Sequence, residues 1–480
     1  MVFNSFNFWI IFPFIFLIYW FIPIKFLKAR NLFLLIVSYL LYMNYKPSFA
    51  IVLLGVTIIC YLGGKIIYRK EVEGKKKKIL CWCFASLGLL PLLIFKYYNF
   101  LNDSLSSVLE SIGLHFALPG LNWSIPVGIS FFTFQAVGYL LDVYKKRITA
   151  EDNFGDFALY VSFFPQVTSG PISTAKDLIP QFKVPHTFCH IQGKDGLKML
   201  LWGMFLKLAI ADRIGLYVDI IYANYIHYSG AICLFASIMY TIQIYCDFAG
   251  YSLMAIGIAK TLGFNLINNF ERPYFAASVT EFWKRWHISL TRWLTTHVYI
   301  NLGGNRCSKF RQYVNIMLTF LVSGLWHGAN WTFIIWGVFH GAFQIVEKAF
   351  IGEKLKNEMK KKKHQFTLSR AIRIVFTFSM VSFAWIFFRM PTLEDATDMI
   401  LKIFSDFGCF SIAPLDSISI VGIGCGLPLL VAKEIREEFM PNRIKFLNNH
   451  IIKWIFYVIV ACYILTMGVL DAGQFIYVSF

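Results

Sequence analysis

Long apolar runs separated by short polar loops dominate the chain and predict membrane-spanning helices. A helix needs about 20 residues to cross the hydrocarbon core of a bilayer, and most of the runs approach that length. The runs cover residues 6–24, 31–45, 48–64, 79–98, 197–218, 232–259, 313–326, 330–350, 372–390, 415–432 and 452–470. Together they predict an all-α polytopic membrane protein of about ten or eleven spans.

Two apolar stretches in the middle of the chain are interrupted by proline and glycine. Residues 123–142 contain Pro126, and residues 157–171 contain Pro165. Because lipid cannot satisfy freed backbone groups, such breaks predict bent or re-entrant segments around a cavity. The stretch 281–300 is too charged to cross lipid, and its Trp and Arg content predicts an interfacial helix.

The distribution of basic residues predicts which loops face the cytoplasm. Lys and Arg concentrate in loops 25–30, 65–78 and 351–373. The positive-inside rule therefore places these loops in the cytoplasm and both termini at the outer side. The same bias accounts for the formal charge of +18, so we do not expect a nucleic-acid partner.

Composition excludes an ordinary soluble enzyme, a coiled coil and a disordered chain. Hydrophobic residues make up 57% of the chain and charged residues 15%, with a mean hydropathy of +0.59. Ten cysteines contain no CxxC pair, which predicts neither a zinc site nor a disulfide framework. We expect one integral-membrane domain over 1–480: N-terminal spans (1–122), a core (123–350), and C-terminal spans with an aromatic tail (351–480).

Four histidines fall between residues 280 and 340, which first raises the question of a metal. They are His287, His297, His327 and His340. Ligands on one helix face need spacings of three or four residues, and none of these histidines is so spaced. The spacing excludes a metal cluster on one helix, and we expect no metal.

His327 is a candidate general base. It lies in the apolar segment SGLWHGANW between Gly324 and Gly328, whose small size leaves room for another group to approach. An ionisable side chain inside a membrane marks a functional site by default, and imidazole titrates near neutral pH. The alternative is a core histidine bonded to a backbone carbonyl, and the spacing alone leaves both interpretations open.

His287 is a second candidate, in the segment FWKRWHISL. Lys284, Arg285 and Arg292 surround it in sequence, so on its own it suits an interfacial histidine that contacts lipid headgroups. The functional alternative is a second polar group at the cytoplasmic mouth of a cavity. The nearby NLGGNR, which ends at Arg306, offers backbone amides to a phosphate, although Gly-Gly turns are common.

The segments FWKRWHISL and GLWHGANWTFIIWGVFHG, about forty positions apart, resemble those of the membrane-bound O-acyltransferase superfamily. PVGISFFTFQAVGYLLDVYKK and ALYVSFFPQVTSGPI are similar to the bacterial branch that holds the membrane subunits of alginate and peptidoglycan O-acetyltransferases. The membrane protein of teichoic-acid D-alanylation is a more distant relative. The resemblance covers nearly the whole chain.

This resemblance implies a fold and roles for three histidines. The family fold is a ring of tilted helices around a central funnel, with shorter broken helices at the constriction. His327 matches the principal catalytic histidine of the family, and His287 matches the second histidine along the same conduit. His340 falls in the WGxxHG pattern, where a structural role is expected.

The resemblance also implies a donor and a location. The family moves an acyl group from a cytoplasmic thioester to the outer face of the membrane, here from acetyl-CoA across the bacterial inner membrane. The phosphates of acetyl-CoA are expected near basic side chains, namely Lys284, Arg285, Arg292 and Arg306.

The C-terminal tail, QFIYVSF, contains a single phenol at Tyr477. From the residues alone it suits an interfacial aromatic anchor. It also resembles the end of the small partner peptide of D-alanylation systems, which implies that Tyr477 is an acyl relay; Val478 stands where relatives often have an aromatic residue. The family further implies an extracytoplasmic partner, a serine hydrolase-like acetyltransferase that modifies a polysaccharide. Alginate, cellulose, peptidoglycan and other glycans all remain open as acceptors.

Two other functions are compatible with a chain of this kind. One is D-alanyl transfer from a carrier-protein thioester to a cell-wall polymer, although the fused tail favours acetyl transfer. The other is transport of a glycan or lipid without chemistry, which predicts inverted repeats with matching broken helices. The sequence shows no such repeat.

Overall fold

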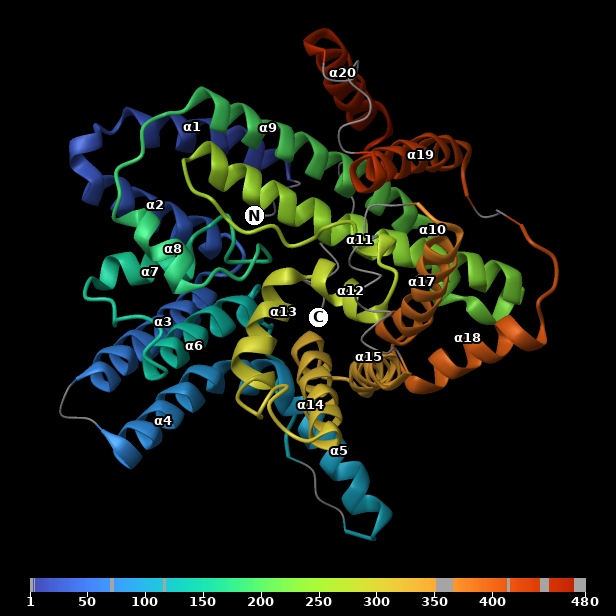
Figure 1. The fold of residues 1–480 in the computed structure, drawn as a ribbon, viewed down its shortest axis with the longest axis horizontal. Helices are drawn as coiled ribbons and strands as arrows, with labels where there is room; N and C mark the ends of the chain where they lie inside the picture. The colour runs from blue at the N-terminus through green and yellow to red at the C-terminus, as the bar shows by residue number, and fades with distance from the viewer. Residues whose placement is uncertain are drawn as a thin grey trace. The chain divides into compact units, whose positions relative to one another are not determined.

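The computed structural model describes residues 3, 5–69, 73–114, 118–350, 366–411, 415–440 and 449–469. Within these ranges every regular element is a helix and none is a strand (Figure 1). The all-α prediction is therefore confirmed for the described part of the chain.

Contacts divide the chain into two compact units, and each is described by itself. Unit 1 comprises Met1–Leu197 and Ala255–Ile267, and unit 2 comprises Lys198–Met254 and Asn268–Phe480. The division falls within two helices, α9 (His190–Met204) and α11 (Gly230–Thr261), which contribute to both units.

The other helices of unit 1 come from the first part of the chain. They are α1 (Phe6–Phe21), η1 (Ile24–Phe26), α2 (Leu27–Met43), α3 (Pro47–Tyr68), α4 (Gly74–Leu92), the π-helical η2 (Leu93–Tyr97), α5 (Tyr98–Ser111), α6 (Ile129–Tyr144), α7 (Phe154–Ser162) and α8 (Ala175–Phe182). Helices α3, α4 and α6 pack against one another, and α2 packs against α7 (Figure 1).

The breaks expected near residues 123–142 and 157–171 are present in unit 1. Helix α6 begins only after Gly128, whose φ of +74° suits glycine, and a Cβ there would lie 2.4 Å from the Val167 carbonyl oxygen. Helix α7 ends at Ser162, and the chain continues as buried, non-helical backbone. Buried backbone groups outside a helix need other hydrogen-bond partners. One example is the amide of Phe164, which donates to the Ser38 hydroxyl at 3.1 Å.

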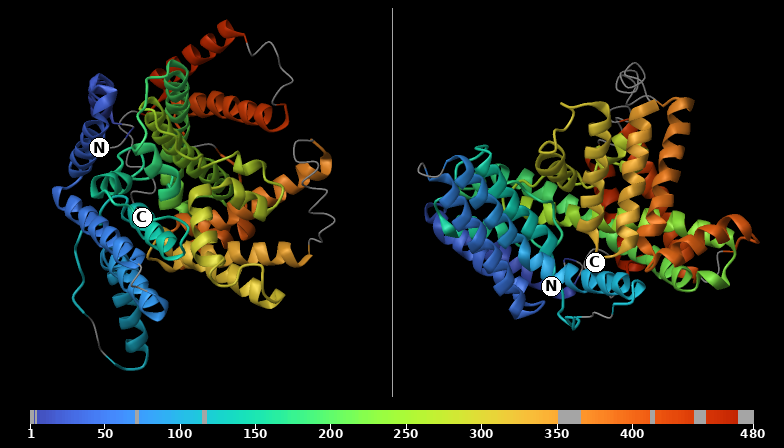
Figure 2. Two further views of the ribbon diagram at one scale, coloured as in Figure 1. Left: turned by 60° about the vertical axis from the view of Figure 1, so that its left-hand side comes forward. Right: turned by 90° about the horizontal axis from the view of Figure 1, so that it is seen from below.

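Unit 2 contains the remaining helices. They are the π-helical η3 (Phe205–Ala211), α10 (Asp212–Ala223), η4 (Tyr225–His227), η5 (Pro273–Phe275), α12 (Val279–Arg285), α13 (Ile288–Leu294), the π-helical η6 (Thr295–Tyr299), α14 (Lys309–His327), α15 (Trp331–Phe350), α17 (Leu368–Arg389), α18 (Leu393–Ser405), α19 (Ser417–Phe439) and α20 (His450–Met467). Helix α15 packs against both α14 and α17, and the three stand side by side in the right-hand view of Figure 2.

The number of spans is smaller than the sequence predicts. By length and composition, six helical segments among the described residues can cross a membrane: Pro47–Tyr68, Gly74–Ser111, Gly230–Thr261, Leu368–Arg389, Ser417–Phe439 and His450–Met467. The first two predicted spans form a pair bent by 106°, which adds at most one more. The chain is a multi-pass helical protein, but the count of ten or eleven is not confirmed, and the ring and funnel remain predictions.

The run predicted as a span at 197–218 contains a π-helical segment and buried charges. On η3, the Lys207 ammonium lies 2.7 Å from Asp212 Oδ1 and 2.5 Å from Asp247 Oδ1. The side chains of Lys207 and Asp247 are buried, and that of Asp212 is 9% exposed. Gly203 on α9 and Gly250 on α11 let the backbones of these two helices come into contact, since a Cβ on either glycine would lie within 2.7 Å of the other's carbonyl oxygen. One cation thus compensates two carboxylates in an apolar interior, which makes the triad sensitive to any loss of charge.

Candidate active site

His327 is the last residue of α14 and lies in an aromatic enclosure within unit 2. Its side chain is buried, at 2% exposure. The imidazole centroid lies 4.9 Å from the ring of Trp326, 5.0 Å from Trp336 on α15 and 5.2 Å from Phe388 on α17, each at a steep angle. Helices α14, α15 and α17 therefore hold this imidazole among apolar rings that exclude water.

The glycines beside His327 bring two helices together rather than leaving open space. A Cβ on Gly324 would lie 2.3 Å from the carbonyl oxygen of Phe333, and one on Gly328 would lie 2.0 Å from the Phe333 ring. Gly337 on α15 meets α14 equally closely, at 2.5 Å from the Phe320 carbonyl oxygen. The group that approaches His327 through its small neighbours is thus the facing helix α15.

His287 is buried at a sharp break and not on an interfacial helix. The predicted helix over 281–300 is divided into α12, α13 and η6, and His287 lies between the first two with φ of +43° and 1% exposure. Two backbone hydrogen bonds hold the break, from Glu271 N to Arg285 O and from Ile288 N to Asn269 O, both at 2.9 Å. This pairing is not predictable from the sequence, because neither partner segment has a strand pattern.

The two predicted catalytic histidines touch the same indole. The Trp326 ring lies 5.5 Å from the His287 ring and 4.9 Å from the His327 ring. Phe248 packs against His287 from α11, with centroids 4.7 Å apart. Unit 2 therefore brings together two imidazoles that are forty positions apart in the sequence and surrounds them with aromatic side chains.

Polar contacts fix the orientation of His287. Its Nδ1 lies 3.2 Å from Asn269 Oδ1 and 3.5 Å from Ser289 Oγ. Burial lowers the pKa of His287 to about 3, so the imidazole is neutral at pH 7. A neutral imidazole offers one nitrogen as a proton acceptor, as a base requires.

His340 extends the aromatic cluster on α15. Its Nδ1 accepts a hydrogen bond from Trp283 Nε1 at 3.3 Å, and Trp336 contacts both His340 and His327, at 4.8 and 5.0 Å. This imidazole is fully buried and tied to an indole, which suits the structural role implied by the family pattern.

The four predicted phosphate-binding residues fall into two groups. Lys284, Arg292 and Arg306 are exposed. Arg285 is buried, and its guanidinium donates to Glu438 at 2.8 and 3.0 Å and to Glu281 at 2.7 Å. Phosphate binding by Arg285 remains a prediction that would require these ion pairs to open.

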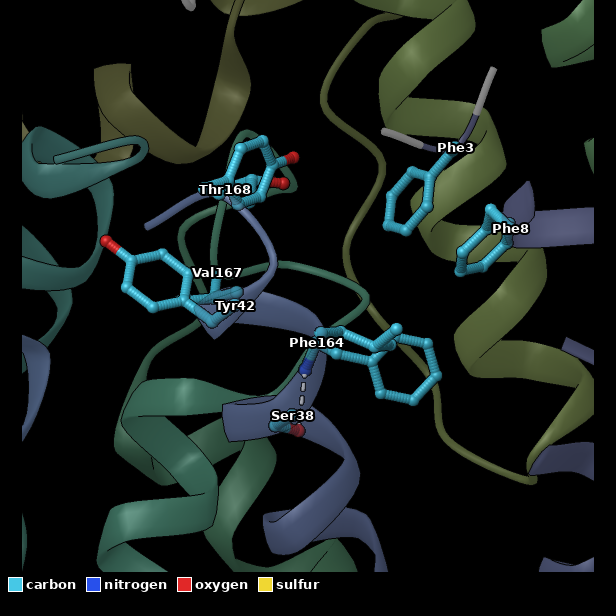
Figure 3. A pocket seen from close by; sticks show the side chains of 9 residues that line it. Phe3, Phe8, Ser38, Tyr42, Phe164, Val167 and Thr168 are labelled. Atoms are coloured by element: carbon cyan, nitrogen blue, oxygen red, sulfur yellow. Dashed lines mark hydrogen bonds between the residues drawn. The ribbon is translucent and has the colours of Figure 1, made fainter. Parts of the chain in front are cut away.

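Other predicted features have different outcomes. Tyr477 and the aromatic tail lie outside the described residues. Within the described ranges, no group of three or more His, Cys, Asp or Glu side chains is arranged to hold a metal ion. A pocket in unit 1, shown in Figure 3, is lined mainly by aromatic rings such as Phe8, Tyr42 and Phe164, and none of the predicted site residues lines it.

Comparison with known proteins identifies the class to which this fold and histidine pair belong. A sequence model of the membrane-bound O-acyltransferase family matches residues 143–388, which contain both histidines. The chain belongs to this family, as the sequence motifs predicted, and is a membrane-embedded acyltransferase.

Individual relatives refine this class. A protein of Pseudomonas aeruginosa named "probable alginate O-acetylase" is 37% identical over 84% of this chain and 75% of its own length. A peptidoglycan O-acetyltransferase of Helicobacter pylori is 33% identical over 79% of this chain and 77% of its own. A teichoic acid D-alanyltransferase of Streptococcus thermophilus is 26% identical over 66% of this chain and 77% of its own.

Proposed function

We propose that this acyltransferase takes acetyl from acetyl-CoA at the cytoplasmic face of the bacterial inner membrane and passes it outward for O-acetylation of a polysaccharide. The observation that carries the proposal is the buried pair His327 and His287 around Trp326, within the segment that matches the family. The names of the alginate and peptidoglycan relatives support acetyl as the group and a polysaccharide as the acceptor.

His327 is the proposed general base. A hydroxyl that attacks the thioester carbonyl loses its proton to the imidazole as the new C–O bond forms. The C–S bond then breaks, and the leaving thiolate of CoA takes up that proton. The aromatic enclosure of His327 supports this role, because charge that develops in a dry site interacts strongly with a nearby imidazolium.

Tyr477 is the proposed first acceptor. A phenol, with a reference pKa near 10, needs a base to become a good nucleophile. The phenyl ester that results is activated enough to pass its acetyl group to a serine hydroxyl of an extracytoplasmic partner, with return of the proton to the phenol. Both termini on the outer side, as the basic loops predict, support this order of transfer.

Exposed cations support a docking site for the phosphates of acetyl-CoA. Lys284 lies on α12, Arg292 on α13 and Arg306 in the loop between η6 and α14, and each is exposed. Arg285 has a different role in this proposal, because its ion pairs with Glu438 and Glu281 hold α12 in place. The first three should affect binding of the donor and Arg285 should affect folding.

The test is turnover by purified protein. Protein in detergent is incubated with acetyl-CoA that carries a radiolabelled acetyl group, and both CoA release and the mass of the C-terminal peptide are measured. The expected result is CoA release with the mass increment of one acetyl group on Tyr477, both lost in His327→Ala. His227→Ala is a matched control, since His227 is an exposed histidine of the same unit. Transfer that persists in folded His327→Ala protein would refute the role of His327.

The same assay distinguishes the second candidate function. The name of the D-alanyltransferase relative supports D-alanyl as the transferred group. The donor in this alternative is a thioester of a carrier protein. Activity with an aminoacylated carrier protein, and none with acetyl-CoA, would establish that alternative. Inactivity with both thioesters in folded protein would instead favour transport without chemistry.

A further inference from the structure

Asn269, which belongs to none of the sequence motifs, makes several hydrogen bonds to the turn at His287. This asparagine lies between α11 and α12 and is 1% exposed. Its side-chain oxygen Oδ1 accepts from Ser289 N at 3.1 Å and from Ser289 Oγ at 2.9 Å, and it lies 3.2 Å from His287 Nδ1. Its main-chain oxygen accepts from Ile288 N at 2.9 Å. One residue therefore binds the backbone on the C-terminal side of His287 and the ring itself.

These contacts determine which ring nitrogen of His287 carries the proton. A main-chain N–H can only donate, so the amide atom that faces Ser289 N must be oxygen, not nitrogen. An amide oxygen can only accept, so His287 Nδ1, which faces the same oxygen, must be the N–H donor. In the neutral imidazole, Nε2 then carries the free electron pair.

Asn269 also stabilises a strained backbone. His287 has φ of +43°, in the left-handed region that a histidine adopts rarely. Its neighbours Ile288 and Ser289 are held through their amides by the main-chain and side-chain oxygens of Asn269. Backbone strain of this kind persists only where surrounding contacts enforce it, and Asn269 supplies two of them.

We propose that Asn269 is a positioning residue that holds His287 in the Nδ1–H tautomer and thereby presents Nε2 as a hydrogen-bond acceptor in the aromatic enclosure that His287 shares with the proposed general base, His327. The role of His287 in catalysis rests on the proposed function, whereas its tautomer does not. Phe248, Trp326 and Ser289 also face the imidazole and carry no charge, and His327 touches the same Trp326 ring. An asparagine can thus select a tautomer here without adding a charge beside the ring.

Two substitutions separate this role from a purely structural one. Asn269→Leu removes the acceptor and should lower kcat by about 10²–10⁴-fold with KM for acetyl-CoA unchanged, the range associated with an active-site imidazole in the wrong tautomer. Asn269→Asp keeps the acceptor but adds a negative charge beside Nδ1–H, which favours the imidazolium form. The acid limb of the pH profile of kcat/KM should therefore move to higher pH in Asn269→Asp. Asn224→Asp, at an exposed asparagine of the same unit, is the matched control and should leave the profile unchanged.

The tautomer can be read directly, without activity. In protein labelled with ¹⁵N-histidine, the signals of His287 are assigned by their loss in His287→Phe. A protonated Nδ1 and an unprotonated Nε2 in the wild type, with a tautomer mixture in Asn269→Leu, support the proposal. A protonated Nε2 in the wild type would overturn it, as would an Asn269→Asp enzyme whose pH profile matches the wild type. If wild-type protein does not turn over acetyl-CoA, the proposed function fails, and the NMR signals still decide the role of Asn269.

Discussion

Replacing Glu438 with glutamine should destabilise unit 2 strongly, whereas the same change at the adjacent Glu437 should not. The Glu438 carboxylate is fully buried and accepts hydrogen bonds at 2.8–3.0 Å from Arg272, Arg285 and Arg370. The substitution removes the negative charge that these three guanidinium groups share. Breaking a buried ion pair costs about 3–5 kcal/mol. The side chain of Glu437 is 34% exposed and forms ion pairs with Arg272 and Lys433. Exposed ion pairs of this kind contribute about 0–1 kcal/mol.

The assay is unfolding of purified protein as the mole fraction of sodium dodecyl sulfate in the micelles increases, followed by tryptophan fluorescence. The transition of Glu438→Gln should shift to a clearly lower fraction, while that of Glu437→Gln stays close to the wild type. Equal transitions for the two variants would refute the reasoning. Arg285 would then again be a candidate ligand for the phosphates of acetyl-CoA. In that case Arg285→Met should raise KM for acetyl-CoA and leave stability unchanged.

Three further predictions concern helix packing, a buried charge and pH. Gly324→Ala should destabilise the protein by about 1–3 kcal/mol, because the new Cβ would lie 2.3 Å from a backbone oxygen. In the same unfolding measurement Gly55→Ala should be neutral or stabilising, because no heavy atom lies within 4 Å of a Cβ there. Lys207→Met should cost about 3–5 kcal/mol by removing the cation shared by the buried Asp247 carboxylate and the nearly buried Asp212 carboxylate, and adding Asp247→Asn should restore part of the loss. Because burial lowers the pKa of His287 to about 3 from an ordinary 6.5, its contribution to stability is complete above about pH 6.5 and declines toward pH 3. His287→Phe should therefore lose less stability than the wild type between pH 6.5 and pH 4.

Apolar periodicity predicted the long helices well, because burial in lipid or protein selects the same residues. The run at 48–64 lies within α3, and the run at 232–259 lies within α11. The pattern failed where tertiary contacts override local preference. The stretch 281–300 has helical composition throughout, yet pairing with the segment before α12 breaks it at His287.

The sequence identified the two histidines of the candidate site through family motifs, but not the residues that hold them. Asn269 lies 18 positions before His287 in a stretch without a recognisable motif, and its contacts depend on the left-handed turn. The pairing of Arg285 with Glu438 joins residues 153 positions apart, and a list of basic side chains around His287 gives no sign of it. Such contacts follow from packing and not from spacing.

The most direct test of the central claim is to measure whether transfer of acetyl across a membrane depends on His327. Inside-out vesicles from cells that contain the protein receive radiolabelled acetyl-CoA at the exposed cytoplasmic face, and label that reaches the vesicle interior as an alkali-labile ester is measured. We expect ester-bound label inside vesicles with the wild-type protein and none with His327→Ala at an equal protein level. Equal internal label with both proteins would contradict it, as would label confined to the outside in the wild type.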